Sequence, residues 1–420
     1  MRETRDSGFD WIGQTPSDWQ FIKGKYIFKQ RNSKGNSVCL QLLSPSQKFG
    51  VVPQTLLEKL TTQNVVKVKE DTDLSTFKTI HIGDFCISLR SFQGGFEYCK
   101  YEGVVSSAYQ VFYPIIEIYD GYYKFLFKDK SFIEKMNSYT ISFRDGKNIA
   151  FSDFGNTYIP YPPLDEQKKI AEFLDIKCSE IDALIADIQA QIETLEQYKR
   201  STVIETVTKG LNPNVQMKDS GIQWIGNIPA TWNCIRGKYI LKYVTKPIRE
   251  DDGVITCFRD GEVTLRSKRR EEGFTMADKE IGYQGIDVGD LVVHGMDGFA
   301  GAIGISDSRG KASPVLNVLE TQKNKRYIMY FLRSMAYGDV FLALATGIRV
   351  RSCDLRWNKL AELFYPIPSL EEQTEIVDYI DRIIKETNDV IADKKEQIAT
   401  LESYKKSIIF EYVTGKKEIE

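Results

Sequence analysis

The chain has 420 residues, of which 42% are hydrophobic and 27% charged, with a formal net charge of −2 at pH 7. These values are typical of a soluble globular protein, and the length predicts two or three domains. The sequence shows no signal peptide and no apolar run of 18 residues, so we expect no membrane contact. The 7 cysteines are scattered and never form a CxxC pair, which predicts a cytoplasmic location and argues against a zinc site.

The charges are unevenly distributed along the chain. Residues 1–157 and 219–364 each carry a net charge of +3, whereas residues 158–218 and 365–420 carry −3 and −5. Any surface that faces phosphate should therefore lie on the two basic segments.

The first recognisable segment, DSGFDWIGQTPSDWQFIKGKYIFK at residues 6–29, recurs at residues 219–242 with 14 of 24 positions identical. If the two copies bind different nucleic-acid sequences, the side chains that contact the bases should differ between the copies. We therefore expect the repeated tryptophans Trp11, Trp19, Trp224 and Trp232 to pack in the core or dock a helix rather than to stack on bases. The same reasoning assigns Lys25 and Lys238 to structure or to phosphate contact.

A variable section follows each copy. In the first we predict a short helix after residue 53, strands at 83–90 and 104–115, and a helix at 122–136. The second has a strand at 286–296 and a helix at 326–344. Glycine- and arginine-rich loops come next, at 142–151 and 347–357. The two sections share little identity, which predicts similar scaffolds with different surfaces.

Each variable section ends at a long helical stretch, Pro163–Gly210 and Ser369–Lys416, and the two align at a constant offset of 206. Proline precedes each stretch, acidic residues fill its first turn, and glycine stands at its end. Neither contains an internal Gly or Pro, so each should form a helix of about 43 residues, roughly 65 Å long.

Heptad spacing within these helices predicts a seam that packs one helix on the other, antiparallel. The seam comprises Leu174, Cys178, Ile181, Ile185, Ile188, Ile192 and Leu195 in the first helix, and Ile380, Ile384, Ile391, Ile398 and Leu401 in the second. Thr387 and Lys394 interrupt the second half of the seam. The alternative is that each helix covers its own domain.

The order of these motifs resembles the specificity (S) subunit of type I restriction–modification systems over essentially the whole chain. The matching features are DSG-x-x-WIG-x-x-P-x-x-W, a variable block, and L-x-EQ opening a long helix, all repeated once. The resemblance implies α/β (α+β) target-recognition domains in two copies, joined by two long antiparallel coiled-coil helices with a pseudo-twofold internal repeat. The expected boundaries are residues 1–163, 164–211, 212–369 and 370–420 for domain 1, helix 1, domain 2 and helix 2.

The resemblance also implies a non-catalytic chain that recognises a split, asymmetric DNA target. Expected partners are double-stranded DNA, two methyltransferase (M) subunits and two restriction or motor (R) subunits. AdoMet, ATP and magnesium would be bound by those partners, so we expect no cofactor, catalytic residue or metal site here. In agreement, the sequence has no GxxxxGK[ST] loop, and YPPL at 161–164 lacks the leading Asn or Asp of an amino-methyltransferase loop.

Arginine can pair bidentately with guanine, and asparagine or glutamine with adenine, so base readers should be polar side chains in the loops that differ between copies. Candidates in the first domain are Arg31, Asn32, Lys34, Arg90, Gln93, Arg144, Lys147 and Asn148. Candidates in the second are Arg266, Lys268, Arg269, Arg270, Arg349, Arg351 and Arg356.

Two other readings are compatible with the sequence. The chain could be a non-catalytic protein-interaction scaffold with two globular modules on a coiled coil. It could also be a self-contained modification enzyme, which would have to bind AdoMet by itself. Salt-dependent affinity for duplex DNA would separate DNA recognition from the scaffold reading.

Overall fold

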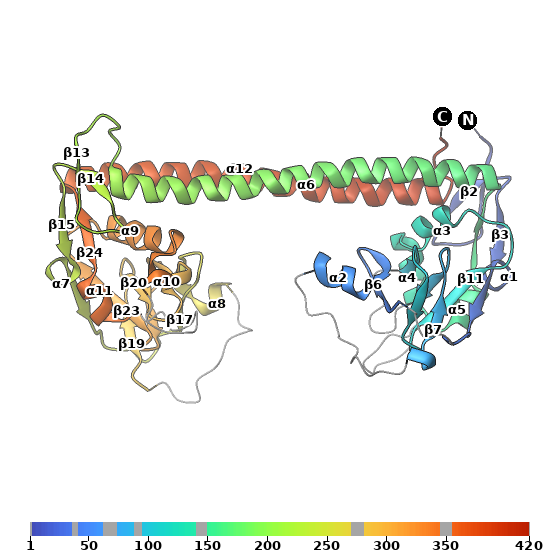
Figure 1. Ribbon diagram of the computed structural model, residues 1–420, viewed down its shortest axis with the longest axis horizontal. Coiled ribbons are helices and arrows are strands. Elements are labelled where there is room, and N and C mark those ends of the chain that lie inside the picture. Colours follow the sequence, from blue (N-terminus) through green and yellow to red (C-terminus); the bar gives the residue numbers. More distant parts are fainter. Residues whose placement is uncertain are drawn as a thin grey trace. The chain divides into compact units, whose positions relative to one another are not determined.

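The computed structural model describes residues 2–35, 41–61, 74–87, 95–139, 149–269, 281–344 and 355–419. They form two compact units, residues 1–188 with 396–420, and residues 189–395. The two long helices, α6 (Leu164–Lys209) and α12 (Leu370–Val413), contribute to both units, as Figure 1 shows. The predicted class, globular α+β domains in two copies with two long helices, is confirmed. No helix among the described residues is long and apolar enough to cross a membrane.

Each unit is built around an antiparallel sheet of four strands. In unit 1 the strand order is β4 (Phe28–Arg31), β11 (Gln110–Pro114), β8 (Phe85–Ile87) and β9 (Phe96–Tyr98). In unit 2 the same order is made by β16 (Leu241–Val244), β23 (Leu316–Thr321), β20 (Leu291–His294) and β21 (Ile303–Ile305). The prediction of two similar scaffolds is therefore confirmed at the level of strand order.

Smaller elements surround these sheets. Unit 1 adds the strand pairs β1 (Thr4–Asp6) with β2 (Gln14–Pro16), β3 (Gln20–Lys23) with β12 (Tyr158–Tyr161), β5 (Leu43–Ser46) with β6 (Gly50–Pro53), and β7 (Lys78–Ile80) with β10 (Gly103–Val105). Its short helices are α1 (Gly24–Ile27), α2 (Gln54–Leu60), η1 (Leu74–Thr76) and α5 (Phe151–Asn156). Unit 2 adds the strand pairs β13 (Met217–Asp219) with β14 (Asn227–Pro229), β15 (Asn233–Arg236) with β24 (Phe364–Ile367), β17 (Ile255–Cys257) with β18 (Val263–Leu265), and β19 (Gln284–Ile286) with β22 (Gly310–Ala312). Its short helices are α7 (Gly237–Ile240), α8 (Arg266–Arg269), η2 (Gly298–Ala300) and α11 (Trp357–Glu362).

Two predicted helices are each broken in two. The segment predicted at 122–136 forms α3 (Asp120–Leu126) and α4 (Lys130–Asn137), because the Asp129 carboxylate caps a new helix by accepting from the amides of Ser131 and Phe132. The segment predicted at 326–344 forms α9 (Lys325–Tyr337) and α10 (Val340–Ala343), interrupted at Asp339, whose φ is 55°.

Two of the predicted strands are also divided. The strand predicted at 104–115 is interrupted by a turn in which the Tyr109 amide donates to the Ser106 carbonyl at 3.0 Å. The segment at 286–296 is divided between β19 and β20 by a turn at Gly289.

The long helices pack against each other within each unit. In unit 1 the Phe173 and Tyr412 rings lie 4.5 Å apart, and Lys405 Nζ donates to Asp182 at 2.6 Å. In unit 2 the Lys199 side chain donates to Asn388 at 2.9 Å, and Lys394 to Gln191 at 2.5 Å. Along α6, from Phe173 to Lys199, the contacted residues of α12 run backwards from Tyr412 to Asn388. The two helices are therefore antiparallel.

The predicted seam positions are all buried or half-buried. Those at the helix starts, Leu174, Cys178, Ile181 and Ile380, also belong to the hydrophobic core of the adjoining globular part. Positions further along, from Ile185 to Leu195 and from Ile384 to Leu401, range from half-buried to buried. Each helix therefore both pairs with the other helix and covers a domain, so the two alternatives raised by the sequence occur together.

A hydrogen bond from a buried tryptophan joins each globular part to the start of a long helix. Trp19 Nε1 donates to Glu166 Oε2 at 3.0 Å in unit 1, and Trp232 Nε1 donates to Glu372 Oε2 at 3.0 Å in unit 2. Both indoles are 0% exposed. The expectation that the repeated tryptophans dock a helix thus fits these two residues.

The glutamine that follows each of these glutamates binds main chain on both sides. Gln167 accepts from the Tyr119 amide at 2.8 Å and donates to the Pro162 carbonyl at 2.8 Å. Gln373 makes the equivalent bonds to Asn324 and Pro368, both at 2.9 Å. The repeated Glu-Gln pair is therefore the docking element of each helix.

The end of the other long helix reaches the same place in each unit. Tyr122 donates to the Val413 carbonyl of α12 at 2.7 Å, and Tyr327 donates to the Val207 carbonyl of α6 at 3.2 Å. The glycine after each helix packs on the buried indole. A Cβ added at Gly415 would lie 3.0 Å from Trp19, and one at Gly210 would lie 3.2 Å from Trp232.

Trp19→Phe should lower the free energy of unfolding by about 2 kcal/mol, because it removes a hydrogen bond to a carboxylate that stays part-buried. Urea unfolding of the purified chain measures the change. Trp11→Phe is the matched control, since its buried Nε1 has no hydrogen-bond partner among the described residues and its loss should cost little. Equal destabilisation by both variants would show that the hydrogen bond contributes nothing beyond indole packing.

Candidate nucleic-acid interface

Eight of the predicted base readers lie outside the described residues, and the structure places the rest. The eight are Arg90, Gln93, Arg144, Lys147, Asn148, Arg270, Arg349 and Arg351. The placed candidates are Arg31, Asn32 and Lys34 in unit 1, and Arg266, Lys268, Arg269 and Arg356 in unit 2.

Arg31 is held in a bidentate ion pair. Its Nε and Nη2 donate to the two oxygens of Asp84 at 2.7 and 3.0 Å, and its guanidinium lies 4.3 Å from the centre of the Tyr113 ring. The Asp84 side chain is buried and also accepts from the His81 amide at 2.9 Å. Arg31, at the end of β4, thus neutralises a buried carboxylate, and this ion pair fixes the orientation of its guanidinium. By contrast, Asn32 and Lys34 are exposed.

Unit 2 contains the same aspartate turn with a different cation. Asp290 corresponds to Asp84, and each follows a glycine of positive φ, Gly289 at 85° and Gly83 at 90°. Asp290 accepts from the Asp287 amide at 2.8 Å, as Asp84 does from His81. Its cation is Lys246, whose Nζ lies 2.8 Å from both carboxylate oxygens. The repeated Gly-Asp pair was visible in the sequence, but its partners were not.

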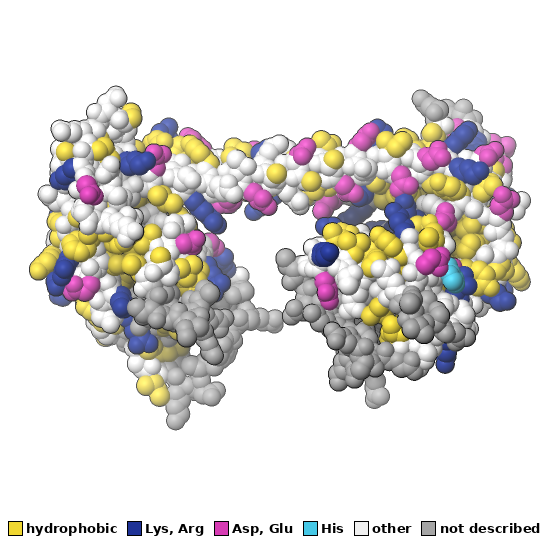
Figure 2. All heavy atoms as spheres, in the orientation of Figure 1, with side chains coloured by type: hydrophobic (Ala, Val, Ile, Leu, Met, Phe, Trp, Pro, Cys, Tyr) yellow, Lys and Arg dark blue, Asp and Glu magenta, His cyan; other side chains and the backbone are white. Residues whose placement is uncertain are grey.

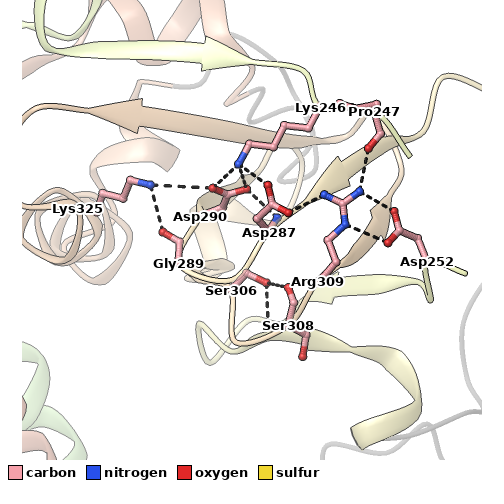
Figure 3. Close-up of polar contacts among 10 residues, drawn as sticks. All are labelled: Lys246, Pro247, Asp252, Asp287, Gly289, Asp290, Ser306, Ser308, Arg309 and Lys325. Carbon is pink, nitrogen blue, oxygen red and sulfur yellow. Dashed lines mark hydrogen bonds and ion pairs between the residues drawn. The ribbon is translucent and has the colours of Figure 1, made fainter. Parts of the chain in front are cut away.

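The Lys246 ion pair extends into a larger network, shown in Figure 3. Lys246 also donates to Asp287 at 2.9 Å, and that hydrogen bond lowers the pKa of the Asp287 carboxyl. Arg309 donates to Asp287 at 2.6 Å and to both oxygens of Asp252 at 3.0 and 2.8 Å. The hydrogen bond from Arg309 likewise holds the pKa of Asp252 below its usual value. Together these bonds tie three loops of unit 2 to one another.

The three described candidates on or near α8 also have partners. Arg266 Nε lies 3.4 Å from the Thr256 hydroxyl, and Lys268 donates to Ser308 at 2.7 Å. Arg269 pairs with Asp260 and Glu262 and lies over the Phe258 ring, and the hydrogen bond to Asp260 raises its pKa. These side chains are exposed or half-buried and form a basic edge whose charge is partly balanced.

The last described candidate, Arg356, is exposed at the start of α11, two residues after the undescribed stretch that holds Arg349 and Arg351. On the face drawn in Figure 2, Lys and Arg are interspersed with Asp and Glu over the described parts of both units. Specific cations, rather than one large basic patch, would therefore have to contact DNA on this face.

Comparison with known proteins gives a consistent family. The model of the type I restriction modification DNA specificity domain matches residues 16–194 and 286–400. The chain is 27% identical over 280 residues to the type I restriction enzyme MjaVIII specificity subunit of Methanocaldococcus jannaschii, covering 63% of each chain. It is 26% identical over 276 residues to the type I restriction enzyme EcoBI specificity subunit of Escherichia coli, covering 59% of this chain and 57% of that one. The matched regions span less than two thirds of these relatives.

Solved structures share the fold over nearly the whole chain. A chain from a structure on complex assembly and conformational transition of the type I R-M system superposes with a TM-score of 0.67 at 14% identity, covering 96% of this chain and 99% of that one. The HsdS subunit from Thermoanaerobacter tengcongensis superposes with a TM-score of 0.52 at 13% identity, covering 98% and 100%.

Arg31→Ala should destabilise the protein by about 3 kcal/mol, because it leaves the buried Asp84 carboxylate without its cation. Lys34→Ala, at an exposed position three residues away, should change stability by less than about 0.5 kcal/mol. Urea unfolding of both variants checks the comparison. A stable Arg31→Ala protein with altered DNA sequence preference would instead make Arg31 a base reader.

Proposed function

The chain belongs to the family of type I restriction modification DNA specificity domains, and from this membership we propose that it is the sequence-recognition subunit of a type I restriction–modification complex. Each globular domain would read one half of a split target, and the helix pair would set the gap between the halves. The expected boundaries, residues 1–163, 164–211, 212–369 and 370–420, are proposed as the limits of these parts.

The observation that carries this proposal is that the two units share one scaffold but carry different side chains beside the sheet. The two sheets have the same strand order, and the same aspartate turn recurs beside them. The cation on that turn differs, Arg31 in one unit and Lys246 in the other, and Arg309 of unit 2 extends the network. A protein that reads two unlike half-sites needs this combination of a shared frame and divergent loops.

The proposed partners are duplex DNA, two methyltransferase subunits and two restriction or motor subunits. We propose that the chain itself is non-catalytic and that AdoMet, ATP and magnesium bind to those partners. The rival reading, a scaffold for proteins alone, is less favoured, since the family is defined by a DNA specificity domain.

Methylome sequencing of cells that carry this chain with its methyltransferase partner, compared with a deletion of this gene alone, tests the proposal. The expected result is loss of one split, asymmetric methylated motif with a fixed gap. An unchanged methylome, with the partner shown to be expressed and active, would support the protein-scaffold reading. Binding of AdoMet by this chain alone would support a self-contained enzyme.

Shortening the helix pair by one matched heptad should shorten the recognised gap. Deletion of Ile192–Tyr198 from α6 and Asn388–Lys394 from α12 removes facing segments of unit 2. Seven residues of helix correspond to about 10.5 Å, or roughly three base pairs. Methylome sequencing should show unchanged half-sites with the shorter gap. A change in either half-site would contradict the role of the helices as a spacer.

A further inference from the structure

The repeated segment at residues 6–29 and 219–242 contains identities that the fold explains and identities that it does not. Trp19 and Trp232 are buried on the helix starts. Asp6 and Asp219 each accept from the amide of a glycine two residues on, Gly8 and Gly221, at 2.9 and 3.0 Å. Folding alone accounts for residues of this kind.

The same holds for the ends of the repeated Gly-Lys-Tyr-Ile motif, which forms α1 and α7. A Cβ on Gly24 would lie 2.7 Å from the Phe154 carbonyl oxygen, and one on Gly237 would lie 2.3 Å from that of Leu360. These positions therefore require glycine. Ile27 is buried and Ile240 packs against the core of unit 2.

Three identical positions in each copy remain, and their side chains are exposed. They form two sets, which we call the Lys-Tyr-Lys sets: Lys25, Tyr26 and Lys29 in unit 1, and Lys238, Tyr239 and Lys242 in unit 2. All six side chains are exposed, with Tyr26 at 60% and Tyr239 at 74%. An exposed residue has little folding reason to stay the same in two copies whose neighbouring sections have diverged.

The contacts within each set leave charge available at the surface. Lys25 Nζ lies 3.2 Å from the Asn156 side-chain oxygen, and Lys238 Nζ lies 3.0 Å from Glu362. Each of these lysines lies over its neighbouring tyrosine ring, at 5.4 and 5.6 Å. The side chains of Lys29 and Lys242 have no hydrogen-bond or ion-pair partner in the described part of the chain.

We propose that the two Lys-Tyr-Lys sets are equivalent, sequence-independent contacts to the DNA phosphate backbone, one for each half-site. This inference rests on the proposed function. The backbone is the same under any half-site, whereas the bases differ, so backbone contacts are the ones that two copies can share. Lysine and tyrosine both donate to phosphate oxygens. A protein-docking surface is less favoured, because four of the six side chains are lysines, which are depleted at protein interfaces, although the two tyrosines alone would suit one.

Glutamine substitution of the unpaired lysines tests this in the complex of the chain with its methyltransferase partner. Affinity is measured against salt concentration for two duplexes, one with the recognised motif and one scrambled. Lys29→Gln and Lys242→Gln should each reduce the slope of log affinity against log salt by about 0.9, and the double variant by about 1.8. Affinity for both duplexes should fall alike, and the methylated motif should stay unchanged.

Two further variants separate charge from other effects. Lys168→Gln removes an exposed lysine of α6 whose repeat counterpart is Thr374, and it should leave the slope unchanged. Tyr26→Phe with Tyr239→Phe removes two neutral donors, so it should weaken binding without changing the slope.

A wild-type slope in the Lys29→Gln and Lys242→Gln variants would overturn the inference. So would loss of methyltransferase copies from the complex, seen by native mass spectrometry, with the slope unchanged, because the sets would then dock protein. Failure of the proposed function would appear differently, as a wild-type complex that shows no salt-dependent binding of either duplex.

Discussion

The hydrogen bond from a buried indole to a helix-start glutamate is the contact on which the rest of the structure depends. It is made by Trp19 with Glu166 and again by Trp232 with Glu372. A carboxylate in the first turn of a helix is favoured by the helix dipole, and the indole N–H donates to it in a part-buried position. The glycine after the other long helix packs on the same indole. One side chain thus fixes the start of one helix and the end of the other against each globular part.

This arrangement explains how the variable sections can diverge without loss of the fold. The indole–glutamate contacts come from the repeated segment and from the start of each long helix. The variable sections add main-chain amides that donate to Gln167 and Gln373, and a tyrosine in each unit, Tyr122 or Tyr327, that donates to the end of the other long helix. The aspartate turn beside the sheet is also kept, while its cation changes from Arg31 to Lys246. The two units therefore share the docking glutamates and the aspartate turn, and they differ in the side chains that bind the turn. Under the proposed function, this suits two domains that recognise different half-sites.

The sequence predicted the features that depend on local pattern or on repetition. These include both long helices, the duplication and the resemblance of the two scaffolds. It did not predict the break at Asp129 or at Asp339, because a single cap or a single positive φ outweighed an otherwise helical pattern. Nor did it show that Arg31 pairs with Asp84, 53 residues further along the chain. A basic residue that binds a distant carboxylate and one whose side chain is exposed look alike in sequence, so only the structure distinguishes Arg31 from Lys34.

The interruptions of the helix seam also acquire a physical reason. Thr387 is buried, and Lys394 extends its amine to Gln191 at 2.5 Å instead of ending against apolar side chains. A polar residue at a seam position costs stability but selects one register, because any slip leaves it facing an apolar partner. The charged pair of Lys405 with Asp182 acts in the same way in unit 1. By its packing alone, an uninterrupted isoleucine seam would not distinguish registers that differ by one heptad. Under the proposed function, a helix pair with more than one register could not hold a fixed gap between the two half-sites. The polar interruptions therefore add to the docking contacts at the helix ends in fixing one register, as the proposed spacer role would need.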